Sequence, residues 1–233
     1  MRLILLLVVT TLLVHSAFSQ QDSIVLLNGK VYRGEVQKVD AGVLTYTELK
    51  KDGTTEVVEL TTDRLFSYVH QGEETVFYVE NEFTGDFLPV ESARRATLGS
   101  YDARQTMKPR FVFYSSLLVG LGVSLLDTYY SQAAYDNFVA TNGTPPISAQ
   151  VGFFGAKPTL MPILVPMVLS GSWAIPSFRI KPKQLLQKNL YGDEEYYRGF
   201  NRVARQKRVL AALKGSVIGI GVGYISYFVF TPN

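Results

Sequence analysis

The chain of 233 residues contains no cysteine, only two histidines and a single tryptophan. The absence of cysteine excludes disulfides, thiolate-bound zinc, iron–sulfur clusters and a cysteine nucleophile. His15 lies in a segment that we expect to be removed, so the predicted mature chain keeps only His70 and cannot build a metal site from clustered histidines. A Ser-His-Asp triad would have to use His70, but its place before Gln71-Gly72 favours an exposed turn residue. We predict no cofactor and no metal.

Charge is distributed unevenly along the chain. Residues 21–90 hold six Lys/Arg and thirteen Asp/Glu, a net charge of −7, whereas residues 91–233 hold sixteen and seven, a net charge of +9. Basic residues beside apolar segments are typical of membrane proteins, in which Lys and Arg set the topology and contact anionic lipid. We therefore expect membrane lipids, and no nucleic acid, as partners of the basic half.

The first apolar segment covers residues 3–14 and follows Arg2. It runs into Ala17-Phe18-Ser19, a small-x-small pattern that predicts a signal peptide of residues 1–19 and a mature chain beginning at Gln20. The protein is therefore expected to be exported.

Residues 20–90 alternate short β-rich runs with turn signals such as Asn28-Gly29 and Asp52-Gly53. The predicted strands cover residues 23–27, 30–39, 43–49, 54–61, 64–70 and 75–80. Strands this short and this closely spaced favour a small, strongly bent antiparallel barrel. We predict a small all-β barrel of the SH3-like or Sm-like type, followed by an α-helical membrane region of two to three hydrophobic helices.

The stretch from Leu27 to Asp40 resembles the first sequence motif of the Sm family, through Asn28, Gly29, Gly34 and Asp40. In such a barrel Gly34 would permit sharp strand curvature, and Asp40 would bond to backbone in the next turn. The Asn with which that family contacts RNA is replaced here by Val43 or Leu44, and the Arg-Gly pair of the second motif is missing. The resemblance therefore implies a fold but not RNA binding, which a domain of charge −7 would also oppose.

The layout of the whole chain resembles uncharacterised envelope proteins of Bacteroidetes-type bacteria. The residues that carry this resemblance are the opening Asp22 to Gly29, the stretch Tyr196 to Phe200 and the basic run Ala204 to Arg208. It implies a location in the bacterial inner membrane, with the β domain in the periplasm. It implies no activity.

The second half begins with a polar linker helix at residues 91–110. The helical membrane region of residues 111–233 then contains three apolar segments, at about 111–130, 159–178 and 209–230. The middle segment carries Pro158, Pro162, Pro166 and Pro176, which predict a kinked, re-entrant or interfacial element.

Small residues recur every four positions in the last segment, at Ala211, Gly215, Gly219 and Gly223. Such a stripe lets another helix approach closely, either the first apolar segment or a second copy of the chain. Two charges, Asp127 and Lys214, lie near the ends of apolar segments and could line an ion pathway.

The topology has three solutions. If all three segments cross, the basic region 179–208 falls on the outside, against the positive-inside rule. If the middle segment does not cross, the basic region 179–208 lies in the cytoplasm, as the rule requires. A third solution retains the N-terminal segment or leaves the β domain in the cytoplasm, but it discards a good cleavage site. The second solution is favoured by the charges.

The sequence predicts a non-enzymatic, membrane-anchored envelope protein that acts as a structural or adaptor subunit through protein contacts or self-association. The alternative is a subunit of a small transporter or channel. A lipid-modifying enzyme is a third hypothesis. It would use Asp193, Glu194 and Glu195 beside Arg198, although acids at that position more commonly cap a helix.

Overall fold

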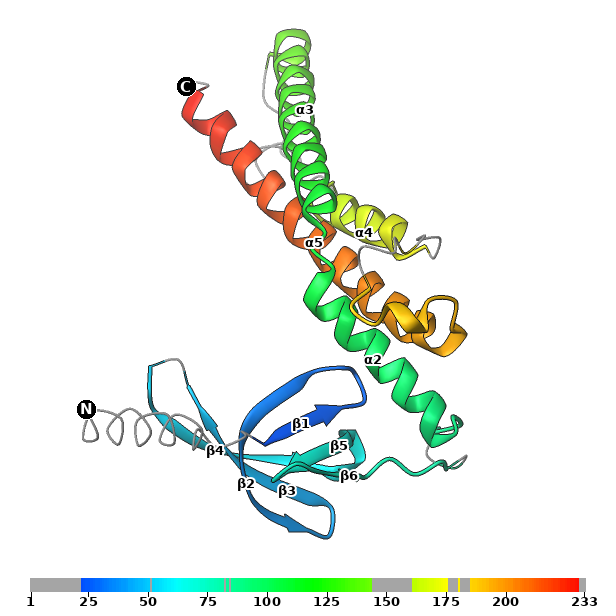
Figure 1. Ribbon diagram of the computed structural model, residues 1–233. Helices are drawn as coiled ribbons and strands as arrows, with labels where there is room; N and C mark the ends of the chain where they lie inside the picture. Colours follow the sequence, from blue (N-terminus) through cyan, green and yellow to red (C-terminus); the bar gives the residue numbers. More distant parts are fainter. Residues whose placement is uncertain are drawn as a thin grey trace, which may run out of the picture. The chain divides into compact units, whose positions relative to one another are not determined.

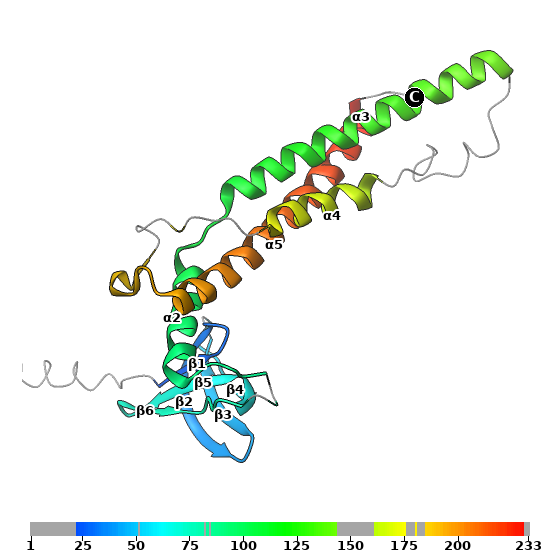
Figure 2. The same cartoon turned by 90° about the vertical axis from the view of Figure 1, so that its right-hand side faces the viewer.

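The computed structural model describes residues 22–50, 52–81, 83, 85–143, 161–175, 180 and 185–230. They fall into two compact units (Figures 1 and 2). The first unit comprises the chain up to Arg104 together with Leu186–Phe200, and the second comprises Gln105–Leu185 and the chain from Asn201 onward. The predicted signal peptide lies outside the described residues.

The first unit contains a six-stranded antiparallel sheet in the order β4-β3-β2-β1-β5-β6. Its strands are β1 (Ser23–Leu26), β2 (Val31–Asp40), β3 (Val43–Leu49), β4 (Thr55–Thr61), β5 (Leu65–His70) and β6 (Glu73–Val76). A 3₁₀ turn, η1 (Thr62–Arg64), joins β4 to β5. Five of the six predicted strands match within one residue at each end, whereas the sixth begins two residues earlier than predicted, at Glu73, and ends four residues earlier, at Val76.

The sheet is open rather than closed. A closed barrel would require β4 to pair with β6, but these strands stand at opposite edges of the order and the described strands do not pair there. Two irregularities bend the sheet, one in β1 at Val25/Leu26 and one in β2 between Val36 and Lys38. The antiparallel β unit that the sequence predicts is therefore present, without the predicted closure.

Alternation along β1 places apolar side chains on both faces of the sheet. One cluster contains Ile24, Leu26, Leu44, Tyr46 and Leu65. The other lies on the opposite face, where Val25 and Leu27 pack with the cluster of Phe66, Tyr78 and Ala93. Ala93 belongs to α2 (Val90–Thr106), so the helix that the sequence predicts as a polar linker covers this second face.

The second unit contains α3 (Arg110–Asn142), α4 (Met161–Ala174) and the greater part of α5 (Glu194–Phe230). In both views α3 and α5 lie side by side (Figures 1 and 2). Phe113 lies against Gly215, and Leu117 against Gly219, so the contacts advance together along both helices. The two helices therefore run in the same direction.

Candidate functional site

Three of the four predicted motif residues of the β unit support contacts between elements. Gly29 has a φ of 75°, and a Cβ there would lie 2.4 Å from the backbone nitrogen of Tyr101 in α2. The carbonyl of the neighbouring Asn28 accepts a bond of 2.9 Å from Arg104 Nε. A Cβ at Gly34 would lie 2.2 Å from the carbonyl oxygen of Thr47 in β3. Both glycines are thus required by close backbone approach.

Asp40 differs from its predicted role. Its carboxylate lies 2.6 Å from Lys38 Nζ in a solvent-exposed ion pair. No hydrogen bond from the following turn to Asp40 is present in the described part of this region. A pair this exposed contributes little to stability.

Asp22, which sequence reasoning used only as part of a resemblance, is the polar anchor of the sheet. Its carboxylate accepts bonds from Val36 N at 3.0 Å, His70 Nδ1 at 2.8 Å and Gln71 N at 3.3 Å. Burial tends to raise the pKa of Asp22, but these hydrogen bonds outweigh it and lower that pKa below its ordinary value. The anchor ties β1 to β2 and to the turn after β5.

An aspartate bonded to a histidine Nδ1 also occurs in catalytic triads. Here His70 is partly exposed and, within the described residues, has no hydrogen bond to a serine hydroxyl. Gln71, beside it, has a φ of 51°. The arrangement is that of a turn held in place by Asp22.

A second buried carboxylate joins segments that are more than eighty residues apart. Asp102 in α2 is completely buried, and its Oδ2 accepts bonds from Leu186 N at 2.9 Å and Gln187 N at 3.0 Å. The same oxygen accepts a bond from the hydroxyl of Tyr196. This carboxylate fixes the stretch before α5, including η5 (Lys188–Leu190), to α2. No local pattern in the sequence marks Asp102.

Two glycines allow α2 and the first turns of α5 to touch. A Cβ at Gly99 would lie 2.0 Å from the carbonyl of Tyr196, and one at Gly199 would lie 1.9 Å from the carbonyl of Ala96. Ser100 Oγ donates a bond of 3.1 Å to the carbonyl of Gly199. The backbones are therefore in direct contact. Sequence reasoning did not single out Gly99, and it named Gly199 only as part of a resemblance.

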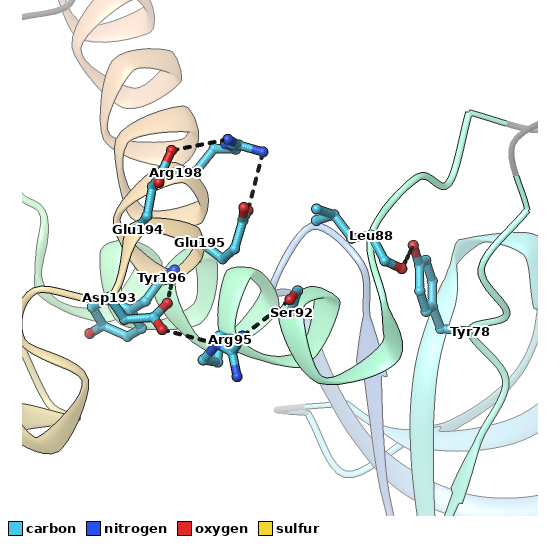
Figure 3. A network of polar contacts seen from close by, with 9 residues as sticks. All are labelled: Tyr78, Leu88, Ser92, Arg95, Asp193, Glu194, Glu195, Tyr196 and Arg198. Atoms are coloured by element: carbon cyan, nitrogen blue, oxygen red, sulfur yellow. Dashed lines mark hydrogen bonds and ion pairs between the residues drawn. The ribbon is translucent and has the colours of Figure 1, made fainter.

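Charged residues at the start of α5 are neutralised by neighbours (Figure 3). Asp193 caps the helix by accepting a bond of 2.9 Å from Tyr196 N, and it forms an ion pair of 3.0 Å with Arg95. Arg198 lies 3.3 Å from Glu194 and 3.2 Å from Glu195. The predicted capping role of the acidic run is confirmed. Figure 3 also shows a separate hydrogen bond, in which Tyr78 Oη donates to the carbonyl of Leu88 at 2.8 Å.

The glycine stripe of α5 lies against α3. A Cβ at Gly215 would lie 2.3 Å from the carbonyl of Phe113, and one at Gly219 would lie 2.1 Å from that of Leu117. At Gly223 it would meet the hydroxyl of Ser124. Ala211, the first member of the stripe, is half-buried. Of the two partners that the sequence leaves open for this stripe, α3 is the one in contact within the chain.

The two predicted membrane-edge charges are placed differently. Asp127 is half-buried, and it accepts a bond of 3.1 Å from the hydroxyl of Tyr224 in α5. Lys214 is exposed. The structure does not bring them together, since Asp127 lies beside residue 224 and Lys214 stands next to Gly215, ten residues earlier on α5.

Among the described residues, two helices are long and apolar enough to cross a membrane: α3 and the part of α5 up to Tyr227. Only 28% of the most apolar stretch of α3 and 33% of that of α5 is buried within the protein. The outward-facing apolar side chains include Phe111, Leu118, Val119, Leu126, Leu210, Val217, Ile218, Val222, Ile225 and Val229. Water does not favour such a surface, whereas lipid does.

The geometry does not fit the favoured topology, in which the region before α5 lies across the membrane from the β domain. Asp102 holds Leu186 and Gln187 in the same compact unit as the sheet. Moreover, α3 and α5 run in the same direction, so a membrane that both cross must be crossed once more between residues 143 and 193. At about 1.5 Å per residue, the fourteen residues of α4 span about 21 Å of the roughly 30 Å needed.

Comparisons with known proteins add no relative. No family model, no curated protein and no solved structure matches this chain.

Proposed function

We propose that this protein is a membrane-anchored subunit of the bacterial cell envelope that works through protein contacts rather than through a chemical reaction. The observation that carries the proposal is the contrast between the two units. One has a buried apolar core around a β sheet, and the other exposes apolar side chains along two packed helices. This is the construction of a folded module on a membrane anchor.

The proposal also includes the fold type of the β unit, its compartment and the membrane that holds the anchor. The β unit is of the SH3-like or Sm-like type, the signal-peptide pattern of residues 1–19 sends it to the periplasm, and the anchor sits in the inner membrane. The same-direction packing of α3 and α5 supports three crossings, with the chain around α4 returning between them.

Edge strands supply the surface through which such a module binds an extended peptide. The sequence suggests residues Thr75 to Val79 for this role, and β6, which ends at Val76, is indeed one edge of the sheet. Arg94 of α2 already binds Glu74 on that strand at 2.8 Å. At the other edge, β4 is longer, and Val57 in its middle is 60% exposed. We propose β4 as the binding edge.

Site-specific photo-cross-linking in cells tests this role. A photoreactive amino acid at Val57 should give a discrete adduct with a partner or a second copy, which then co-purifies from gently solubilised membranes. The matched control is Lys38 in β2, also exposed but on an inner strand. Equal labelling at both positions, or isolation of the protein alone, would contradict the adaptor role.

Cysteine labelling tests the crossings, and the chain has no native cysteine to interfere. The exposed positions are Glu59 in β4, Gln187 before α5 and Asn137 in α3. In cells with a permeable outer membrane, Glu59→Cys and Gln187→Cys should react with an impermeant maleimide, whereas Asn137→Cys should react only after lysis. Reaction of Gln187→Cys without Glu59→Cys would refute the arrangement. Reaction of Asn137→Cys alone would place the β unit in the cytoplasm, which is the orientation that the positive-inside rule favours if the chain crosses three times.

A further inference from the structure

Basic residues precede the apolar parts of both α3 and α5, and we call them the basic end: exposed Lys108, Arg110 and Arg205, half-buried Lys207 and buried Arg208. Lys207 Nζ donates a bond of 3.1 Å to the carbonyl of Met107, so the two sequences meet here although they are a hundred residues apart. The cluster exists because the helices are parallel. In an antiparallel pair, the two basic runs would lie at opposite ends.

Neither α3 nor α5 carries an acidic side chain close to the exposed members of the basic end, Lys108, Arg110 and Arg205. Residues 105–126 and 201–230 contain no Asp or Glu. The first acid of α3 is Asp127, seventeen residues after Arg110 and hence about 25 Å further along the helix. Lys108, Arg110 and Arg205 are exposed. Like charges this close repel one another, so the basic end attracts an anion.

The surface beside the basic end indicates which anion. Exposed apolar side chains begin at the very next residues, with Phe111 75% exposed on α3 and Leu210 53% exposed on α5. A ligand that satisfies both surfaces carries a phosphate and hydrocarbon chains in one molecule. A nucleic acid or a free phosphate would satisfy only the charges.

We propose that the basic end is a binding site for the headgroups of acidic phospholipids, held at the level where the apolar surface of α3 and α5 begins. Exposed Arg110 and Arg205 would bind phosphate oxygens through paired N–H groups, and exposed Lys108 would act as an additional positive charge. This inference rests on the proposed membrane anchoring and adds to it a choice among lipids.

The chain carries its own reporter for this site. Its one tryptophan, Trp173 at the end of α4, packs edge-to-face against Phe111, with ring centroids 6.3 Å apart. Phe111 follows Arg110 directly. A lipid bound at the basic end is therefore expected within quenching range of Trp173.

The experiment reconstitutes the full chain in phosphatidylcholine vesicles that contain a small fraction of brominated lipid, either phosphatidylglycerol or phosphatidylcholine. Brominated phosphatidylglycerol should quench Trp173 at least about twofold more strongly than the same amount of brominated phosphatidylcholine, and salt should reduce the difference. The double variant Arg110→Gln/Arg205→Gln should abolish the difference. Lys214→Gln, which removes an exposed charge further along α5, should leave it intact.

The outcomes separate this inference from the proposed anchoring. Equal quenching by both lipids would refute the acidic-lipid site while the anchor stands. No quenching by either lipid would refute the anchor and the site together. Loss of the excess quenching on adding inorganic phosphate at constant ionic strength would overturn the lipid assignment in favour of a free anion. Since the salt dependence is measured on the unmodified protein, the test remains decisive even if the double variant does not fold.

Discussion

The two units differ in the side chains that they bury. The first encloses apolar clusters and two carboxylates, Asp22 and Asp102, each with several hydrogen-bond donors. The interface between α3 and α5 in the second is made of glycine, serine and short contacts to backbone carbonyls, while larger apolar side chains face outward. The first unit has the buried core of a folded domain, whereas the second has two helices that are long and apolar enough to cross a membrane.

Glycine nevertheless brings helices together in both units. Gly99 and Gly199 allow α2 to touch α5 in the first, as Gly215 and Gly219 allow α3 to touch α5 in the second. The difference lies in what accompanies the contact. In the first unit Asp102 adds charge-assisted bonds that stay strong only because water is excluded, whereas in the second the packing itself is the main interaction.

The largest effect is expected at Asp102. Asp102→Leu leaves two backbone N–H groups and the Tyr196 hydroxyl without their acceptor, which should destabilise the first unit by about 3–5 kcal/mol. Hydrogen exchange of residues 186–193 and thermal melting of the full chain in detergent would measure it. Tyr196→Phe removes only one donor and should cost about 1–2 kcal/mol. Equal effects of the two changes would show that Asp102 does not act through the chain before α5.

An intermediate effect is expected in the glycine stripe. Gly219→Ala should force α3 and α5 apart, because its Cβ would lie 2.1 Å from a backbone carbonyl, at a cost of about 1–3 kcal/mol. Gly221→Ala is the matched control, since a Cβ there meets nothing within 4 Å and alanine is the better helix former. Disulfide formation between Ser124→Cys and Gly223→Cys reports the packing. The disulfide should form less in Gly219→Ala than in Gly221→Ala. A similar yield of disulfide in these two variants would contradict the contact between Gly219 and α3.

The smallest effect is expected at Asp22 and depends on pH. Its pKa is lowered in the folded state, so the ionised group stabilises the fold above its unfolded pKa of about 4, and this contribution is lost as pH falls through the lower folded pKa. Asp22→Asn should therefore cost about 1 kcal/mol at neutral pH and lessen the loss of stability in acid. Near-UV circular dichroism of thermal melts would follow this, with exposed Asp40→Asn as control. If Asp22→Asn lost stability in acid as much as the unmodified protein does, Asp22 would not be the carboxylate that stabilises the sheet.

Local patterns predicted the local structure well. Turn pairs such as Asn28-Gly29 and Asp52-Gly53 lie between strands, since a positive φ suits glycine, and Gly29 and Gly53 both adopt it. Asp193 caps α5, as an acid before a helix commonly does. The four-residue spacing of glycines placed them on one helical face, because that spacing is close to one turn.

Contacts across long sequence separations were not predictable in the same way. Asp102 reads as one polar residue in a polar helix, and only the fold brings Gln187 and Tyr196 to it. Asp40, assigned a turn role by resemblance, instead pairs with Lys38. Charge counts favour an arrangement in which the middle segment does not cross, and this stays a prediction. The direction of α3 relative to α5 was not predictable from them, because charge counts carry no information about helix direction.

The sequence by itself determined the strands, the caps, the apolar segments and the unequal charge of the two halves, because each follows from neighbouring residues and their periodicity. Only the tertiary structure decided that the sheet stays open, that α2 covers one of its faces, and that α3 and α5 run in the same direction. Those features depend on contacts between residues up to about a hundred positions apart, where packing and shared hydrogen bonds select one arrangement among several that the local pattern allows.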